Sequence, residues 1–144
     1  PDSALLDEVG SFFLAVFRTF ASDVARQAGV RATPGQIRTL QVVSLNPGSS
    51  VVEIARGLAV SNASACTALG KLAKLGWVKQ EVDRTDRRVR RVHLTRKGQA
   101  VVDEFQAAQA RRVAAVIARF NKRELNEFRT FVRRITKAIG DIYG

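Results

Sequence analysis

The sequence predicts a mainly α-helical fold that carries one small β-hairpin. Along most of the chain, apolar residues recur every three or four positions, which is the spacing of amphipathic helices. Serine, threonine and asparagine stand where these helices should begin, and glycine stands where several should end. Two short stretches within residues 77–94 instead alternate between apolar and polar residues, as β-strands do.

The composition indicates one globular domain, residues 1–144. The chain is 46% hydrophobic and 26% charged, which is enough for a sizeable core. The single cysteine, Cys66, excludes an internal disulfide framework, and no Cys/His cluster indicates a metal site. We expect no cofactor and, because neither a leader nor an apolar run of about 20 residues is present, a cytoplasmic protein without a membrane segment.

The net charge points to an anionic partner. The formal charge is +11 with a pI near 11.2, beyond what solubility requires. Between Lys71 and Gly98 there are ten Lys or Arg against three acids, a net of +7 in 28 residues. Most of the excess charge is therefore expected in this one segment.

The first element is expected to be a long helix over residues 4–28. Its apolar face is unusually aromatic and consists of Leu5, Val9, Phe12, Phe13, Val16, Phe17, Phe20 and Val24. Phenylalanines at helical spacing usually form a core. The alternative is that Phe13, Phe17 and Phe20 line a ligand cavity. Leu40, from the next helix, would then form its opposite wall.

Two helices are expected next, each opened by a capping box in which a hydroxyl and a Gln or Glu three residues later bond to each other's backbone. Thr33 and Gln36 open the first, and Asn46-Pro47-Gly48 ends it. Ser50 and Glu53 open the second, which is short.

A further helix is expected after a turn of about three residues, a spacing typical of helix-turn-helix units. Ser61 or Asn62 caps it, and Gly76 follows its end. Its buried stripe is expected to be Ala65, Leu69, Leu72 and Leu75.

Residues 77–82 and 89–94 are expected to form a hairpin whose tip is the arginine-rich segment between them. Thr95 caps a long helix, and Asn121 opens the last one. The predicted fold is thus a winged helix-turn-helix with long N- and C-terminal helices. Residues 34–98 form its DNA-binding core.

Residues 4–28 and 99–144 are expected to form a helical dimerisation region. Their apolar stripes are too long for one small winged domain to bury, so a second copy of the chain is the expected partner. The residues assigned to this homodimer contact are Leu5, Phe12, Leu125, Phe128, Ile135 and Ile139. The alternative is a helical bundle that closes within one chain.

The stretch from Leu58 to Gly98, LAVSNASACTALGKLAKLGWVKQEVDRTDRRVRRVHLTRKG, resembles the MarR family of bacterial winged-helix transcriptional regulators. Gly76-Trp77-Val78, Asp83-x-x-Asp86-Arg87-Arg88 and Leu94-Thr95-x-x-Gly98 stand in family register, and the order of elements agrees over nearly the whole chain. The resemblance implies a homodimer that binds pseudo-palindromic operators in double-stranded DNA. It also implies a repressor that a small aromatic effector releases from DNA.

The helix that follows Ser61 is expected to read the major groove. The residues opposite its apolar stripe are Asn62, Ala63, Ser64, Thr67 and Lys71. Asn can pair with adenine, hydroxyls can contact base edges or phosphates, and the Ala63 methyl can touch thymine. Ser61 either contacts a base or only caps the helix. In the family, the position of Thr67 is often an arginine.

The hairpin tip is expected to reach the minor groove, where an inserted guanidinium reads groove width. By family register Arg88 is the inserted residue, and Asp86 pairs with it and fixes its direction. Arg84 and Arg87 add phosphate contacts. A second set, Arg90, Arg91, Arg96 and Lys97, either meets phosphates or lies on a solvated face or against carboxylates.

No enzymatic constellation assembles in the sequence. Cys66 and His93 lie on different elements without a third orienting group, so we do not expect an enzyme. Cys66 is expected to be a half-buried packing residue. The alternative function is a non-specific architectural nucleic-acid-binding protein whose basic hairpin contacts only the DNA backbone.

Overall fold

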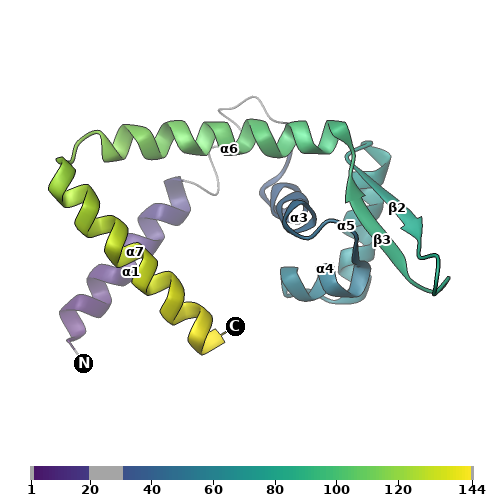
Figure 1. The fold of residues 1–144 in the computed structure, drawn as a ribbon, viewed down its shortest axis with the longest axis horizontal. Coiled ribbons are helices and arrows are strands. Elements are labelled where there is room, and N and C mark those ends of the chain that lie inside the picture. The colour runs from purple at the N-terminus through teal and green to yellow at the C-terminus, as the bar shows by residue number, and fades with distance from the viewer. Residues whose placement is uncertain (1, 20–30, 144) are drawn as a thin grey trace. The chain divides into compact units, whose positions relative to one another are not determined.

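The computed structural model describes residues 2–19 and 31–143 and is mostly helical (Figure 1). Its elements in chain order are α1 (Ser3–Phe17), α3 (Pro34–Leu45), β1 (Ser49–Ser50), α4 (Val51–Leu58), α5 (Asn62–Lys74), β2 (Val78–Val82), β3 (Arg90–Leu94), α6 (Arg96–Ile117) and α7 (Lys122–Tyr143). The chain divides into two compact units, residues 1–108 and 109–144. In the part that the structure describes, no helix has the length and apolarity needed to cross a membrane.

The helix starts are where the sequence places them. Capping boxes at Thr33 and Ser50 open α3 and α4, and the Ser61 hydroxyl accepts from the backbone of residue 64 to open α5. Helix α4 ends at Ala59, a left-handed residue at φ 55°. Helix α5 ends before Gly76, at φ 74°, where glycine carries no steric cost.

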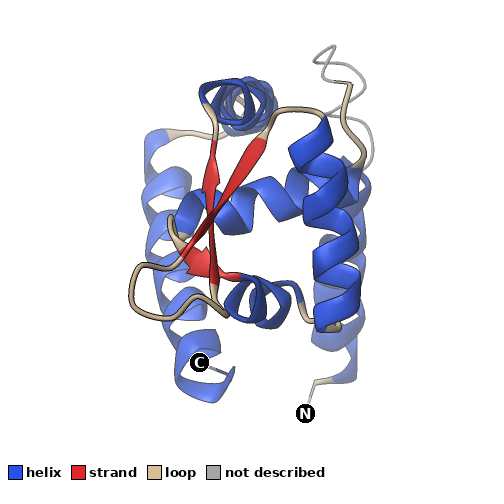
Figure 2. Ribbon diagram, turned by 90° about the vertical axis from the view of Figure 1, so that its right-hand side faces the viewer, coloured by secondary structure: helices blue, strands red, loops and turns tan. Residues whose placement is uncertain are grey.

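The sheet has three antiparallel strands in the order β1-β3-β2 (Figure 2). Strand β2 pairs with β3 from Val78↔Leu94 to Val82↔Arg90, which is the predicted hairpin. Strand β1 was not predicted, because two serines that precede a helix show no strand pattern. Its pairing of Ser50 with Arg91 ties the start of α4 to the hairpin.

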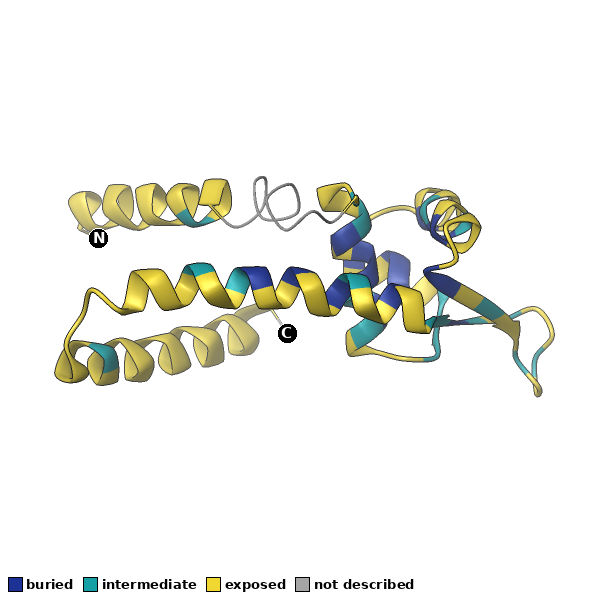
Figure 3. Cartoon of the chain, turned by 90° about the horizontal axis from the view of Figure 1, so that it is seen from above, coloured by how far each residue is buried: buried dark blue, intermediate teal, exposed yellow. Residues whose placement is uncertain are grey.

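The core of the first unit lies where α3, α4, α5, the sheet and the start of α6 meet. The buried residues that form it are Leu40, Val43, Ile54, Leu58, Leu69, Leu72, Trp77, Val78, Val92 and Val102. In Figure 3 these elements carry the dark blue of buried residues. The predicted stripe of α5 is confirmed for Ala65, Leu69 and Leu72, whereas Leu75 is exposed.

Gly98 fixes the approach of α6 to the sheet. A Cβ atom at this position would lie 1.9 Å from the carbonyl oxygen of Trp77. That same oxygen accepts a bond from the backbone N–H of Thr95, and the Thr95 hydroxyl accepts from the N–H of Gly98 at 3.1 Å. Only a residue without a side chain fits this contact.

Helices α1 and α7 each expose a continuous apolar face, and both are coloured as exposed along almost their whole length in Figure 3. In α1, Phe12 is 54% exposed, and in α7, Phe128 is 51% exposed. Neither helix contains a buried residue. The second half of the predicted helix 4–28 lies mostly outside the described residues.

Candidate nucleic-acid interface

Helix α5 presents a polar surface opposite its buried stripe. Asn62, Ala63, Ser64, Thr67 and Lys71 are all exposed, as the sequence predicts. The Thr67 hydroxyl donates to the carbonyl of Ala63 at 3.0 Å, so its oxygen lone pairs face outward as acceptors. Lys74, which the sequence analysis did not include, is exposed three residues after Lys71 and has the same helical spacing.

Ser61 acts as a helix cap. Its oxygen accepts from the backbone N–H of Ser64 at 3.1 Å, and its hydroxyl lies 3.0 Å from the Ser64 hydroxyl. The Ser61 hydroxyl thus both donates and accepts a hydrogen bond within the first turn of the helix, which favours the capping alternative for this residue. Asn62 begins the helix and is not the cap.

An open groove of about 750 Å³ lies between α3 and α5. Its polar lining includes Thr33, Arg38, Thr39, Ser64, Thr67 and Lys71. Four residues of the predicted recognition surface, Ala63 among them, therefore border a hollow that the first half of α3 shares.

The carboxylate of Asp83 organises the hairpin tip. It accepts from the backbone N–H of Thr85 at 2.8 Å, from the Thr85 hydroxyl at 2.6 Å and from the N–H of Asp86 at 3.0 Å. The bond from the Thr85 hydroxyl, followed by one from Arg91 and then by the two backbone N–H bonds, holds the pKa of Asp83 far below its ordinary value. Asp83 had no predicted role, although an Asp at the start of a turn is a known signal.

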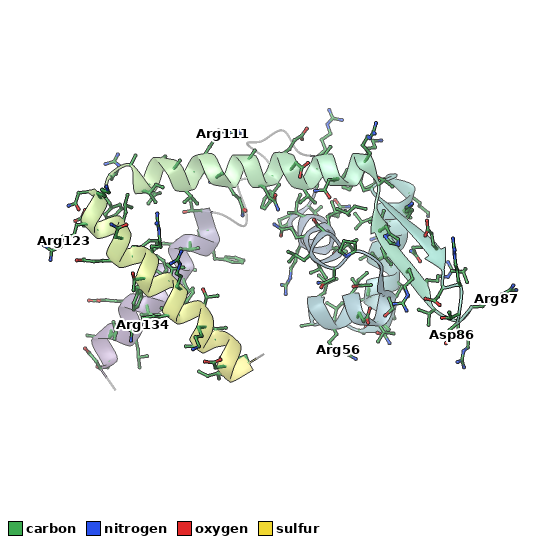
Figure 4. All side chains as sticks on the ribbon, viewed as in Figure 1. Arg56, Asp86, Arg87, Arg111, Arg123 and Arg134 are labelled. Atoms are coloured by element: carbon green, nitrogen blue, oxygen red, sulfur yellow. The ribbon has the colours of Figure 1, made fainter. Side chains whose placement is uncertain are left out.

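Asp86 holds Arg88 at the tip, as predicted. The carboxylate accepts from Nε of Arg88 at 3.1 Å, from Nη2 at 3.2 Å and from the Arg88 backbone at 3.0 Å. These bonds to Arg88 lower the pKa of Asp86. The Arg88 side chain nevertheless remains 91% exposed. Figure 4 shows Arg87 projecting from the same tip into solvent.

Arg91 takes the carboxylate alternative. Its Nε lies 2.8 Å from Asp83, and its Nη1 lies 3.9 Å from Glu53 of α4. Bonding to Asp83 raises the pKa of Arg91. Arg91 is thus an internal clamp, whereas Arg84, Arg90, Arg96 and Lys97 are exposed.

The ligand-cavity alternative is not formed as the sequence reasoning described it. Leu40, which that alternative placed in the cavity wall, is fully buried and packs in the core with Val43 and Ile54. Phe13 and Phe17 are exposed on α1, and Phe20 lies outside the described residues. Cys66 is exposed rather than half-buried, because it lies on the flank of α5 away from the buried stripe.

The residues assigned to a dimer contact lie on the exposed apolar faces. Leu5 and Phe12 are on α1, and Phe128, Ile135 and Ile139 are on α7, all exposed. Leu125, at the start of α7, is partly buried. Large apolar side chains at helical spacing that residues 2–19 and 31–143 leave exposed are the pattern of an association surface.

The helix pair α4 and α5, the hairpin that follows it and the exposed cations of both define a winged helix-turn-helix protein. Residues 28–89 match the family model described as MarR family. Over 122 residues the chain is 29% identical to a Thauera aromatica protein named "Putative transcriptional regulatory protein for hcr operon", covering 85% of this chain and 72% of that protein.

Solved structures share the fold. A MarR family protein from Bacillus stearothermophilus superimposes with a TM-score of 0.85 at 19% identity, over 96% of this chain and 95% of that one. FabT of Streptococcus pneumoniae, solved in complex with DNA, gives 0.80 at 18% identity and 99% coverage of both chains. Residues 28–89 thus match a MarR-family model, in agreement with the resemblance seen in the sequence, and the shared fold confirms the predicted fold class.

Proposed function

We propose that this protein is a homodimeric, sequence-specific DNA-binding regulator in which α5 enters the major groove and the β2–β3 tip enters the minor groove. The observation that carries the proposal is the Asp86–Arg88 pair, which holds an almost fully exposed guanidinium at a turn that Asp83 orders. A pre-aligned cation pays little conformational entropy on binding. The solved complex of FabT with DNA supports the same partner.

In this proposal residues 34–98 form the DNA-binding core, and the remaining helices associate with a second copy. The contact residues on α5 are Asn62, Ala63, Ser64, Thr67 and Lys71, with Arg84, Arg87 and Arg88 at the hairpin. Two copies related by a two-fold axis would read two half-sites about one helical turn apart.

The test is competition binding between an inverted repeat from DNA beside the gene and bulk DNA. A regulator prefers its site by roughly a thousandfold or more, whereas an architectural protein shows scarcely any preference. Arg88→Ala should weaken operator binding on the order of tenfold. Arg111→Ala, which removes one exposed arginine of the second unit, is the matched control (Figure 4).

We further propose that the protein is a repressor and that a small aromatic effector releases it from DNA. The match of residues 28–89 to the MarR family and the exposed phenylalanines of α1 support this step. A panel of phenols and benzoates, added to the operator complex, tests it. Operator binding that no member of the panel weakens would remove the effector from the proposal.

A further inference from the structure

The unit formed by residues 109–144 carries a second concentration of positive charge. It contains nine Lys or Arg against three acids, a net of +6 within a chain of +11. Most of the excess was expected in residues 71–98, but the +7 there is offset by a net charge of −2 in residues 99–108, and residues 1–70 have no net charge. The net positive charges of residues 71–98 and 109–144 are therefore almost equal.

Four cations of α7 lie along one line. Lys122, Arg129, Arg133 and Lys137 are spaced by seven, four and four residues, so they share one face of the helix, and all four are exposed. We call these four residues the α7 stripe. At 1.5 Å per residue the stripe is about 22 Å long, with about 6 Å between the last three charges.

The α7 stripe is electrically unsatisfied. Within residues 2–19 and 31–143 none of its members forms an ion pair, although Arg123 on the same helix pairs with Glu127. Asp141, four residues after Lys137, makes no such contact with it either. Like charges four residues apart repel, so an external anion bound along the stripe would relieve this repulsion.

We propose that the α7 stripe is a second surface for nucleic acid, which contacts the phosphate backbone of duplex DNA in addition to the helix-turn-helix and hairpin. A length of about 22 Å corresponds to about six base pairs at 3.4 Å each. By helical spacing, Asn126, Thr130 and Thr136 lie beside these cations and Gly140 follows Lys137 by three residues; all four are polar or small. A helix that lies on a membrane buries its apolar face in the lipid. In the proposed dimer the second copy covers that face of α7, which includes the exposed Phe128 and Ile135, so only its cationic face is available to a partner.

The test uses the full-length triple variant Arg129→Gln, Arg133→Gln, Lys137→Gln and random-sequence duplex DNA. The control variant Arg111→Gln, Arg119→Gln, Arg123→Gln removes the same charge from the same unit outside the α7 stripe (Figure 4 labels Arg111 and Arg123). The slope of log affinity against log salt should fall by about three in the stripe variant and change less in the control. Equal slopes in the two variants would overturn the proposal.

The same measurement is repeated in a background with Arg84→Gln, Arg87→Gln and Arg88→Gln. The effect of the α7 stripe should persist there, because this surface does not depend on the hairpin. If the variant with the three hairpin substitutions binds an operator as tightly as the wild type, the proposed function is contradicted, but the salt-dependence result for the α7 stripe still holds. If the stripe variant loses binding to phosphatidylserine vesicles but not to duplex DNA, the assignment to nucleic acid is wrong.

Discussion

Asp83 and Arg91 face each other across the hairpin, with 2.8 Å between Oδ2 of the carboxylate and Nε of the guanidinium. Asp83 follows the last residue of β2, and Arg91 lies in β3 opposite Ser50 of β1. One oxygen of Asp83 thus orders the turn while the other binds the strand. The Asp83 side chain that joins the turn to the strand is only 15% exposed.

Asp83→Asn should remove an acid-sensitive part of the folding free energy. The folded-state pKa of Asp83 is depressed, so the unfolded state binds more protons at low pH, and this contribution is present above the ordinary value of 3.8 and lost as pH falls through the folded value. Urea unfolding of both proteins from neutral to acid pH measures it. The wild-type advantage should shrink below about pH 4, and a constant difference would contradict the assignment.

Asp86→Ala should keep Arg88 at the hairpin tip but remove the hydrogen bonds that orient its guanidinium. A mobile guanidinium loses more conformational entropy on binding, so operator affinity should fall several-fold. This loss should be smaller than the loss caused by Arg88→Ala. The two changes should be strongly non-additive in a double-mutant cycle read by fluorescence anisotropy. Independent, additive effects would show that the pair does not act as one unit on DNA.

Gly98→Ala should destabilise the first unit by about 1–3 kcal/mol or more, because the added methyl group collides with the backbone carbonyl of Trp77, which cannot move aside. The measurement is thermal unfolding followed by circular dichroism. Gly35→Ala is the control, since a Cβ there meets nothing within 4 Å. Equal melting temperatures for the two variants would show that the approach of α6 is looser than described.

Phe128→Ala combined with Ile135→Ala should weaken self-association on the order of a hundredfold, because both side chains lie on the exposed apolar face of α7. Sedimentation velocity over a range of protein concentrations measures the shift. Thr130→Ala with Arg134→Ala, on the polar side of the same helix, should leave association unchanged. An unaltered profile for the first pair would exclude this face as the dimer contact.

Cys66 should react with N-ethylmaleimide in the native protein, because its thiol is exposed on α5. It lines the same small hollow as Arg88 and Arg90, beside the hairpin. Operator DNA should therefore slow the alkylation, which mass spectrometry follows, whereas the same DNA at high salt should not. Alkylation at the same rate with and without DNA would place α5 outside the groove.

The features that the sequence predicts well are the local ones. Helix starts at Thr33, Ser50 and Ser61 depend on side chains within three residues, so the pattern and the structure agree. Strand β1 depends on pairing with a strand about forty residues later, which no local signal encodes. The contact of Gly98 with Trp77 is also long-range, although the family motif includes both residues.

The sequence predicted which residues form the candidate site better than it predicted what each residue does there. The exposed face of α5 and the Asp86–Arg88 pair agree with the sequence reasoning, while their contact with DNA remains a prediction. For Arg91, contact with carboxylates was one of the alternatives, but the structural role of Asp83 was not foreseen, because counting charges treats it as a surface group. The stripe on α7 was overlooked for a related reason: its cations are dispersed in the sequence and align only when helical spacing is considered.

Ser50 is at once the last residue of β1 and the N-cap of α4, and the adjoining Glu53 faces Arg91 of β3. Through this link the hairpin and the helix-turn-helix are joined directly, and we expect them to move together as one rigid DNA-binding unit. A signal that releases the protein from its operator would then have to change the distance between the DNA-binding units of the two copies, because the hairpin and α5 of one unit cannot leave the DNA separately.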